Sequence, residues 1–423
     1  MVKQATEDIK AIGAAIEADI ISDRRYFHAH PEPSGKEFAT SDAICERLDA
    51  LGIPYRRVAE TGVIATVRGT AGSGKAAVSN AAASSDGVAG AGDATGAASA
   101  AARCIALRCD IDALPVTELT EAPYASENPG MMHACGHDCH IAMMLGTVRI
   151  LRDLASEFSG EARILFQPAE EISIGSTKMI EAGALDGVDT IYGAHIWSEI
   201  DTGLFSCEAG RRMAHTDWFR IDIEGVSAHG SMPHKGVDAI VVGAEMIDAL
   251  QILVSRDISP FEPAVVTVGE FHGGEARNIM AGSAYLTGTV RTWSDELRRE
   301  LPSCLEHIAE KTAHTFGAVA HVTYEEGNAG LSNDVKCSKR AQLAVAEVLG
   351  AQAIGKYRGT LSGEDFSEYL RYVPGVFVFI GCRNPEVGAR HPQHSCYYQV
   401  DESVLAKGSM VAAQYAIDFL QGR

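Results

Sequence analysis

A chain of 423 residues is longer than one ordinary hydrophobic core supports, so its length favours two domains. Hydrophobic residues make up 46% and charged residues 22%, which is typical of a globular protein. The 56 acidic residues outnumber the 36 basic ones, giving a net charge of -20, and no run rich in lysine and arginine stands out. This balance argues against nucleic acid or an anionic membrane as the main partner.

The N-terminal stretch mixes acidic with apolar residues and lacks the uninterrupted apolar core of a signal peptide. No apolar run approaches the ~18 residues of a membrane span. The ten cysteines are scattered along a long chain, a distribution typical of reduced thiols. We therefore expect a cytoplasmic protein that has no membrane partner.

Helical periodicity covers 8–28 and 39–51, and a short strand is predicted at 63–67. The composition then changes abruptly. From 69 to 102 the chain is almost entirely alanine, glycine, serine, aspartate and threonine, with too little apolar bulk to bury. We interpret 69–102 as a flexible surface loop between two strands.

Strands and helices alternate in the next part of the chain, which predicts an α/β fold with a mainly parallel sheet. The predicted strands are 104–108, 162–166 and 190–194, and the predicted helices are 140–158 and 176–184. From about residue 210 the order becomes βαββαβ, that of a ferredoxin-like domain. Its predicted elements are 218–223, 238–255, 264–271, 284–291, 294–316 and 319–324.

After residue 333 the α/β pattern resumes, with a helix at 334–349, a strand at 376–380 and a final helix at 402–419. The sequence therefore predicts one α/β domain built from 1–209 and 327–423. A second, ferredoxin-like domain at 210–326 is inserted into it.

Acidic residues and one histidine follow three of the predicted strands. Asp110 and Asp112 follow the first, Glu170 and Glu171 the second, and His195 the third. Ligands gather at the carboxyl ends of parallel strands. We therefore expect these side chains to meet at one edge of the sheet.

The decapeptide MMHACGHDCH at 131–140 is unusually rich in metal-binding side chains. Thiolate and imidazole are ligands suited to zinc and its neighbours. Cys135 and His137 can converge on one point from a loop, whereas positions i and i+2 of a helix face different ways. A solvated polar loop or a reactive thiol is the alternative interpretation of the decapeptide alone. The expected convergence of strand ends beside it favours a metal site.

Glu170 and Glu171 are adjacent carboxylates that point in different directions after a strand, so one can bind metal while the other handles a proton. A solvated acidic pair is the alternative. For His195 and His394, a satisfied core histidine is the competing interpretation. With Cys135, His137 and Glu171 they supply enough ligands for two metals if one ligand bridges.

Nine short segments run in order over essentially the whole chain apart from 69–102. They are RCDIDALPVTE, MHACGHDCH, FQPAEE, GAHIW, GVSAHGSMPHKGVDAI, FHGGEARNIM, GTVRT, SGEDFS and HSCYYQVDE. Together they resemble the amidohydrolase branch of the dinuclear aminoacylase and glutamate-carboxypeptidase family, which includes hippurate hydrolases, auxin-conjugate hydrolases and N-acetyldiaminopimelate deacetylases.

The resemblance implies two divalent metal ions per subunit, zinc or manganese, with cobalt possible. The implied ligands are Cys135, His137, Glu171, His195 and His394, with the thiolate bridging. Glu170 would be the general base. Asp112 and Asp138 would orient the ligands from behind. Asp110 is not counted as a ligand, because other branches of the family have a histidine there.

The inserted domain serves as a lid and dimerisation domain in the family. His229 resembles the histidine that crosses the dimer interface and steadies the oxyanion in the neighbouring subunit's site. From its local sequence alone, a surface histidine would be the preferred interpretation. Asn278 is similar to a lid residue that hydrogen-bonds the substrate, and Arg277 or Arg291 would hold a substrate carboxylate unless it is a surface charge. We accordingly expect a homodimer or higher homo-oligomer.

These implications predict a metal-dependent amidohydrolase that cleaves small N-acyl amino acids into a carboxylic acid and a free amino acid. The alternative on the same scaffold is a dipeptidase or carboxypeptidase. A catalytically silent metal-binding scaffold gives no reason to keep Glu170 beside Glu171. The preferred acyl group, the amino acid and the native metal are not readable from the sequence.

Overall fold

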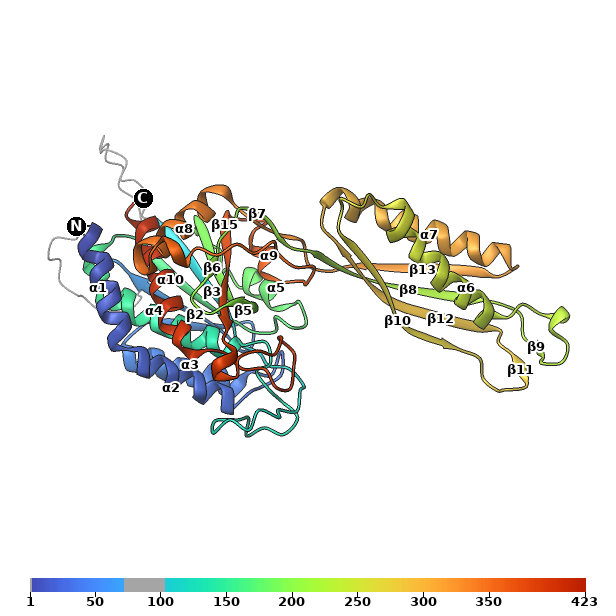
Figure 1. The fold of residues 1–423 in the computed structure, drawn as a ribbon, viewed down its shortest axis with the longest axis horizontal. Coiled ribbons are helices and arrows are strands. Elements are labelled where there is room, and N and C mark those ends of the chain that lie inside the picture. Colours follow the sequence, from blue (N-terminus) through green and yellow to red (C-terminus); the bar gives the residue numbers. More distant parts are fainter. Residues whose placement is uncertain (1, 72–102) are drawn as a thin grey trace, which may run out of the picture.

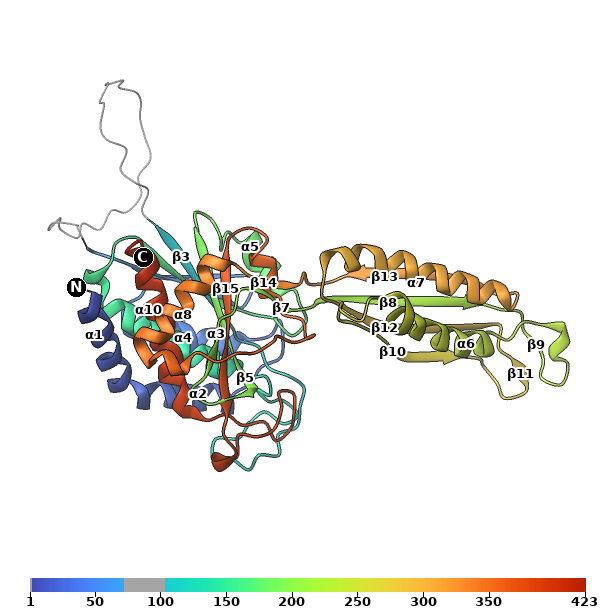
Figure 2. The ribbon, with the colours of Figure 1, turned by 45° about the horizontal axis from the view of Figure 1, so that its top comes forward.

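The computed structural model describes residues 2–71 and 103–423 and has two parts joined end to end (Figure 1). Most of the loop predicted at 69–102 lies outside the described residues. A layered α/β part, here called the large domain, holds both ends of the described chain. A second part, the small domain, projects from it like an arm (Figure 2). No helix among the described residues is long and apolar enough to cross a membrane.

The large domain is formed by the two ends of the chain. Its elements are α1 (Val2–Ala15), α2 (Glu17–Ala29), α3 (Phe38–Leu51), β1 (Tyr55–Val58), β2 (Gly62–Arg68), β3 (Cys104–Asp110), α4 (His137–Asp153), β4 (Glu161–Gln167), α5 (Gly175–Glu181), β5 (Thr190–Asp201), β6 (Phe205–Ser206), β7 (Gly210–Met213), β14 (Leu331–Asn333), α8 (Val335–Leu349), α9 (Phe366–Tyr369), β15 (Gly375–Arg383) and α10 (Leu405–Leu420).

A seven-stranded sheet with the order β1-β2-β4-β3-β5-β15-β6 forms the middle layer of this domain. The four central strands run parallel, and the outer strands pair antiparallel. Its strands β3 and β15 are buried almost throughout, as expected for parallel strands covered on both faces. One face packs on the core lined by α1, α2, α3, α4, α8 and α10, and the other on α5 and α9. This confirms the predicted mixed α/β fold with a mainly parallel sheet.

Three element predictions in the large domain are wrong in detail. The single helix predicted at 8–28 is two helices that separate at Ile16, because α1 packs on α10 whereas α2 packs on α4. Helix α4 begins at His137 rather than at residue 140. Strand β5 does not end before His195 but continues to Asp201, because its second half keeps pairing with β15. His195 therefore lies within a strand.

The small domain has the predicted βαββαβ order. Its elements are β8 (His215–Glu224), β9 (Ala228–His229), α6 (Ala239–Ile252), β10 (Ala264–Gly273), β11 (Ile279–Met280), β12 (Ser283–Thr292), α7 (Asp295–Thr315) and β13 (Val319–Glu326). Its antiparallel sheet has the order β10-β12-β8-β13. Helices α6 and α7 pack on one face of this sheet around a core of their own. The short pair β9 and β11 lies at the end of the arm farthest from the large domain (Figures 1 and 2).

Candidate metal centre

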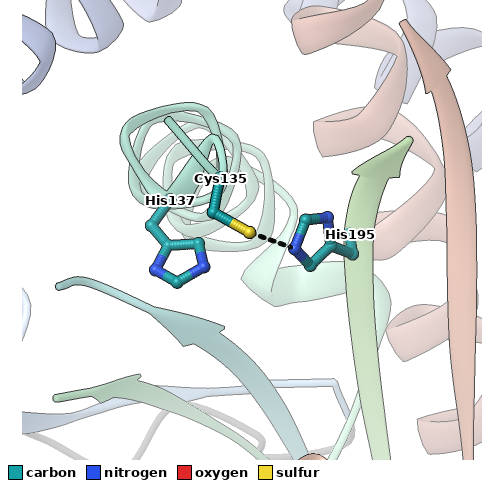
Figure 3. A group of neighbouring side chains, drawn as sticks. All are labelled: Cys135, His137 and His195. Carbon is teal, nitrogen blue, oxygen red and sulfur yellow. Dashed lines mark hydrogen bonds between the residues drawn. The ribbon is translucent and has the colours of Figure 1, made fainter. Parts of the chain in front are cut away.

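Cys135, His137 and His195 converge beside the carboxyl edge of the parallel sheet. Cys135 lies on the loop before α4, His137 is the first residue of α4, and His195 comes from β5. The Cys135 Sγ lies 3.4 Å from His195 Nε2. Figure 3 shows the thiol directed at the His195 ring, with the His137 ring beside it. Each residue offers a ligand atom within 4.8 Å of the others.

Glu171 and His394 complete a second group that shares the same thiol. Ligand atoms of Cys135, Glu171 and His394 also lie within 4.8 Å of one another. His394 Nε2 is 3.6 Å from Glu171 Oε1, and His137 Nε2 is 3.9 Å from that oxygen. His394 has a φ of 66°, an uncommon backbone conformation for a residue with a side chain, found at functional sites. The structure thus gathers all five sequence-predicted ligands, with Cys135 common to both groups.

The ligand atoms of these side chains are suited to binding divalent cations. His137 Nε2 and Glu171 Oε1 are buried and have no hydrogen-bond partner among the described residues, an expensive arrangement unless another group binds there. The His195 Nδ1–H donates to the carbonyl oxygen of Ile196 at 2.6 Å, which leaves Nε2 to coordinate a metal ion. Burial, then the neighbouring His140, lowers the pKa of His195, so its imidazole is neutral as a metal ligand must be.

The electrostatic surroundings also favour positive charge. Burial lowers the pKa of His137, but the carboxylates of Asp110, Asp112 and Glu171 outweigh it and raise that pKa to about 10. Burial, followed by the charge of Glu171, raises the pKa of the Cys135 thiol. A bound divalent cation reverses this effect, because a coordinating thiol is deprotonated. The donor set and its charge therefore fit borderline metal ions such as zinc.

Asp112 holds two of the candidate ligands in place. Its Oδ1 and its carbonyl oxygen lie 3.2 and 2.9 Å from His137 Nδ1. Its Oδ2 accepts hydrogen bonds from the backbone N–H of Glu171 at 3.0 Å and from the Ser34 hydroxyl at 2.6 Å. These contacts orient the His137 ring so that Nε2 faces the site.

Asp110 and His140 lie close to His137, yet their hydrogen-bonding groups are already used. Asp110 Oδ1 is 2.5 Å from His140 Nδ1, and its Oδ2 accepts from Arg108 Nη1 at 2.7 Å. His140 Nε2 accepts the backbone N–H of Ile196 at 3.0 Å. Ligand atoms of Asp110, His137 and His140 lie within 4.8 Å of one another, so the exclusion of Asp110 from the ligand set stays a prediction.

Asp138 faces away from the centre. Arg24 Nε donates to its Oδ2 at 2.8 Å, and His28 Nδ1 lies 2.8 Å from the same oxygen. Burial raises the pKa of Asp138, but the charges of Arg24 and His28 outweigh it and lower that pKa. Asp138 contacts none of the predicted ligands by hydrogen bond in the described structure, so it anchors the first turn of α4 to α2.

Glu170 lies beside a buried acidic cluster that was not predicted from the sequence. Its Oε1 is 3.4 Å from the backbone N–H of Asp365, and carboxylate oxygens of Glu170, Glu364 and Asp365 lie within 4.8 Å of one another. Arg108 neutralises part of this charge, with Nη2 3.0 Å from Glu364 and 2.7 Å from Asp365. Burial and the neighbouring carboxylates of Glu364 and Glu171 raise the pKa of Glu170. The segment SGEDFS was the only sequence signal for Glu364 and Asp365.

Glu37 also belongs to the site, although no sequence motif indicated it. It is fully buried, and its Oε1 accepts the backbone N–H of Ala169 at 2.9 Å. Ala169 has a φ of 54°, a strained value for alanine. Glu37 therefore secures the turn that presents Glu170 and Glu171.

A hollow of about 730 Å³ opens in front of the candidate metal ligands. Its lining includes Glu170, Glu171 and Glu364 from the large domain, and Trp218 and Arg291 from the small domain. Arg291 is half-buried, and burial lowers its pKa. Its Nη1 donates to the neighbouring Val290 carbonyl at 3.0 Å, and no ion pair is formed with a carboxylate of the described residues. The hollow has the size of a small-molecule site.

The other predicted residues of the small domain lie elsewhere. His229 is exposed on β9, and Arg277 and Asn278 are exposed on the loop before β11. This end of the arm is remote from the large domain in both views (Figures 1 and 2). Within one chain, His229, Arg277 and Asn278 therefore do not reach the hollow.

Comparison with known proteins agrees with this geometry. A family model described as peptidase family M20/M25/M40 matches residues 106–418. N-acetyl-L-cysteine deacetylase of Bacillus subtilis is 36% identical over 397 residues, covering 94% of this chain and 87% of that protein. N-acyl-L-amino acid amidohydrolase of Geobacillus stearothermophilus is 38% identical over 323 residues, covering 76% and 80% of the two chains. A solved Bacillus subtilis structure described as a dinuclear metal-binding peptidase of the M20 family is 31% identical, with a TM-score of 0.79 over 97% of this chain and 100% of that one. The chain therefore belongs to peptidase family M20/M25/M40, as the nine sequence motifs indicated.

Proposed function

We propose that this enzyme is a metal-dependent amidohydrolase that cleaves N-acyl amino acids into a carboxylic acid and a free amino acid. The observation that carries the proposal is the position of Glu170, which adjoins two groups of candidate metal ligands in a hollow of about 730 Å³. The names of the two curated relatives, a deacetylase of N-acetyl-L-cysteine and an amidohydrolase of N-acyl-L-amino acids, support this substrate class.

Two divalent cations would be held by the two ligand groups, with the Cys135 thiolate shared. When bound, such ions supply Lewis acidity toward the amide carbonyl and lower the pKa of water toward neutrality. Zinc or manganese suits the mixed sulfur, nitrogen and oxygen donors, and cobalt is also compatible. Glu170 accepts the proton of the attacking water at a carboxylate oxygen and returns it to the departing amine nitrogen. Burial and the neighbouring carboxylates of Glu364 and Glu171 raise the pKa of Glu170, which favours its holding the proton between the two steps.

Arg291 is the better candidate for the substrate's α-carboxylate. Arg291 lines the hollow and forms no ion pair with a carboxylate of the described residues, so an incoming carboxylate would supply one. Arg277 lies at the remote end of the arm, so it could contribute only from another subunit.

A second copy of the chain would deliver His229 and Asn278. These residues are exposed at the end of the arm and do not reach the 730 Å³ hollow of their own subunit. In a homodimer the arm of one subunit would bring His229 to the neighbour's oxyanion, which a protonated or N–H imidazole can stabilise. The free thiols of all ten cysteines agree with a reducing, cytoplasmic location.

Two neighbouring substitutions test the assignment. Glu170→Gln should keep the metal content yet lower kcat at least ~100-fold, the scale of a lost general base. Glu171→Ala should instead lose metal, measured by elemental analysis of the purified protein. Normal turnover of Glu170→Gln would refute the role of Glu170. Assays should offer N-acetyl and N-benzoyl amino acids beside dipeptides, since faster hydrolysis of the dipeptides would assign the enzyme to the peptidase alternative.

A further inference from the structure

A second hollow, of about 450 Å³, lies where the two domains meet. Its wall on the large domain is the segment 357–361 together with Glu199 from β5. Its wall on the small domain is Pro263, immediately before β10, and Trp293, immediately after β12. This second hollow has no role in the hydrolysis proposed above.

The two hollows are the two ends of one cleft. Val265 and Arg291 face each other in the β10–β12 pair and line the first hollow, beside the candidate metal ligands. Pro263 and Trp293 lie two positions farther along the same two segments, just beyond the ends of β10 and β12, so the alternation of side chains places them on the same face of the sheet. The Trp293 N–H donates to the Pro263 carbonyl at 3.2 Å, which continues the ladder. On the opposite wall, three residues line both hollows: Glu199, Thr360 and Leu361.

The second hollow is lined by two aromatic rings held in position by their neighbours. The Tyr357 hydroxyl donates to Glu199 Oε2 at 2.8 Å, and its ring lies 6.0 Å from that of Trp197. Trp293 lies against Gly359, where an added Cβ would come within 3.0 Å of the indole Cη2. Rings that are already fixed bind a planar apolar group at a low entropic cost.

Arg291 lines the first hollow and lies two positions before Trp293 of the second. A substrate whose amide lies at the metal centre and whose α-carboxylate meets Arg291 carries its amino-acid side chain on the same α-carbon. That side chain then extends along the wall from Arg291 toward Trp293. We propose that the second hollow binds the side chain of the substrate's amino acid and selects aromatic ones. This inference rests on the proposed function and adds the class of amino acid, which the proposed function leaves open.

The test compares two substrates that differ only in the amino-acid side chain, N-acetyl-L-phenylalanine and N-acetyl-L-alanine. The metal-loaded enzyme should show a higher kcat/KM for the phenylalanine derivative. Trp293→Ala and Tyr357→Ala should each lower the ratio of the two kcat/KM values about tenfold, the lower end of what apolar pocket contacts contribute. Because both substrates meet the same enzyme sample, a change in folded or metal-loaded fraction cancels in the ratio.

Tyr372→Ala is the matched control, because this tyrosine is 65% exposed and lines neither hollow. It should leave the ratio at the wild-type value. An unchanged ratio in both Trp293→Ala and Tyr357→Ala, with N-acetyl-L-alanine still hydrolysed, would overturn the aromatic side-chain site alone. Failure of the wild-type enzyme to hydrolyse any N-acyl amino acid would instead overturn the proposed function.

Discussion

Among the described residues, Arg108 is the cation that pairs with the acidic cluster behind Glu170, and replacing it should cost more stability than replacing a surface arginine. Its side chain is fully buried. It lies 2.7 Å from Asp110, 2.7 Å from Asp365 and 3.0 Å from Glu364, and its Nε donates to Gln167 at 2.8 Å. Arg108→Met keeps most of the apolar stem but leaves buried carboxylates without their counter-charge.

Removing one partner of a buried ion pair typically costs ~3–5 kcal/mol, because the remaining charge is uncompensated. Arg108 serves three carboxylates, so we expect Arg108→Met to reach at least that range. Adding Asp365→Asn removes one uncompensated charge and should recover part of the loss. Simple loss of packing predicts no such recovery.

Urea unfolding of the metal-free protein, followed by circular dichroism, measures these differences without interference from metal binding. The matched control is Arg371→Met, since Arg371 is 63% exposed and pairs with Glu368 at 2.7 Å. An exposed pair of this kind contributes ~0–1 kcal/mol. If Arg108→Met lost no more stability than Arg371→Met, the buried cluster would not depend on its cation and the reasoning would be refuted.

Three further predictions concern packing, pH and assembly. Gly193→Ala should destabilise the protein by ~1–3 kcal/mol in urea unfolding, because the new Cβ would lie 2.6 Å from the ring of the buried Phe366; unaltered stability would contradict this packing. Burial raises the pKa of Asp418 from 3.8 to about 6, so the folded protein binds a proton more tightly and its stability falls as the pH rises through this window. Asp418→Asn should flatten that part of the stability curve, and an identical pH dependence in variant and wild type would disprove the linkage. Mixing and refolding two inactive variants, His229→Ala and Glu170→Gln, should restore up to about a quarter of wild-type activity. Half of the randomly formed dimers would be mixed, and each mixed dimer would hold one intact site out of two. No recovery despite proven subunit exchange would exclude His229 acting across subunits.

Local sequence patterns were sufficient for much of the fold. Apolar periodicity depends on neighbours within a few residues, and it identified the alternating strands and helices of the large domain and the βαββαβ order of the small one. The exact extent of β5 was out of reach, because whether the chain continues as a strand past His195 depends on pairing with β15, far away in sequence. The beginning of α4 at His137 was missed for a related reason, since its first turn is fixed by contacts of Asp138 with Arg24 and His28.

The sequence by itself determined which chemical groups were available to the site. A thiol, imidazoles and paired carboxylates after strands indicated a metal centre, and the rule that parallel strands deliver their ends to one edge indicated where it would form. Only the tertiary structure decided which of these groups remain available. Asp110 is hydrogen-bonded to Arg108 and His140, whereas His137 Nε2 and Glu171 Oε1 have no hydrogen-bond partner in the part of the chain that the structure describes.

The decapeptide 131–140 illustrates the division. Its composition predicted metal binding, but it could not say that Cys135 would meet His195 or that Asp138 would turn toward α2. Nor could the small domain's sequence reveal that His229 lies at the far end of an arm while Arg291 and Trp293 line a cleft at its base. Composition and periodicity are local properties of the sequence. Which hydrogen bonds a side chain makes, and how far apart two side chains lie, depend on residues that are remote in sequence and meet only when the chain packs.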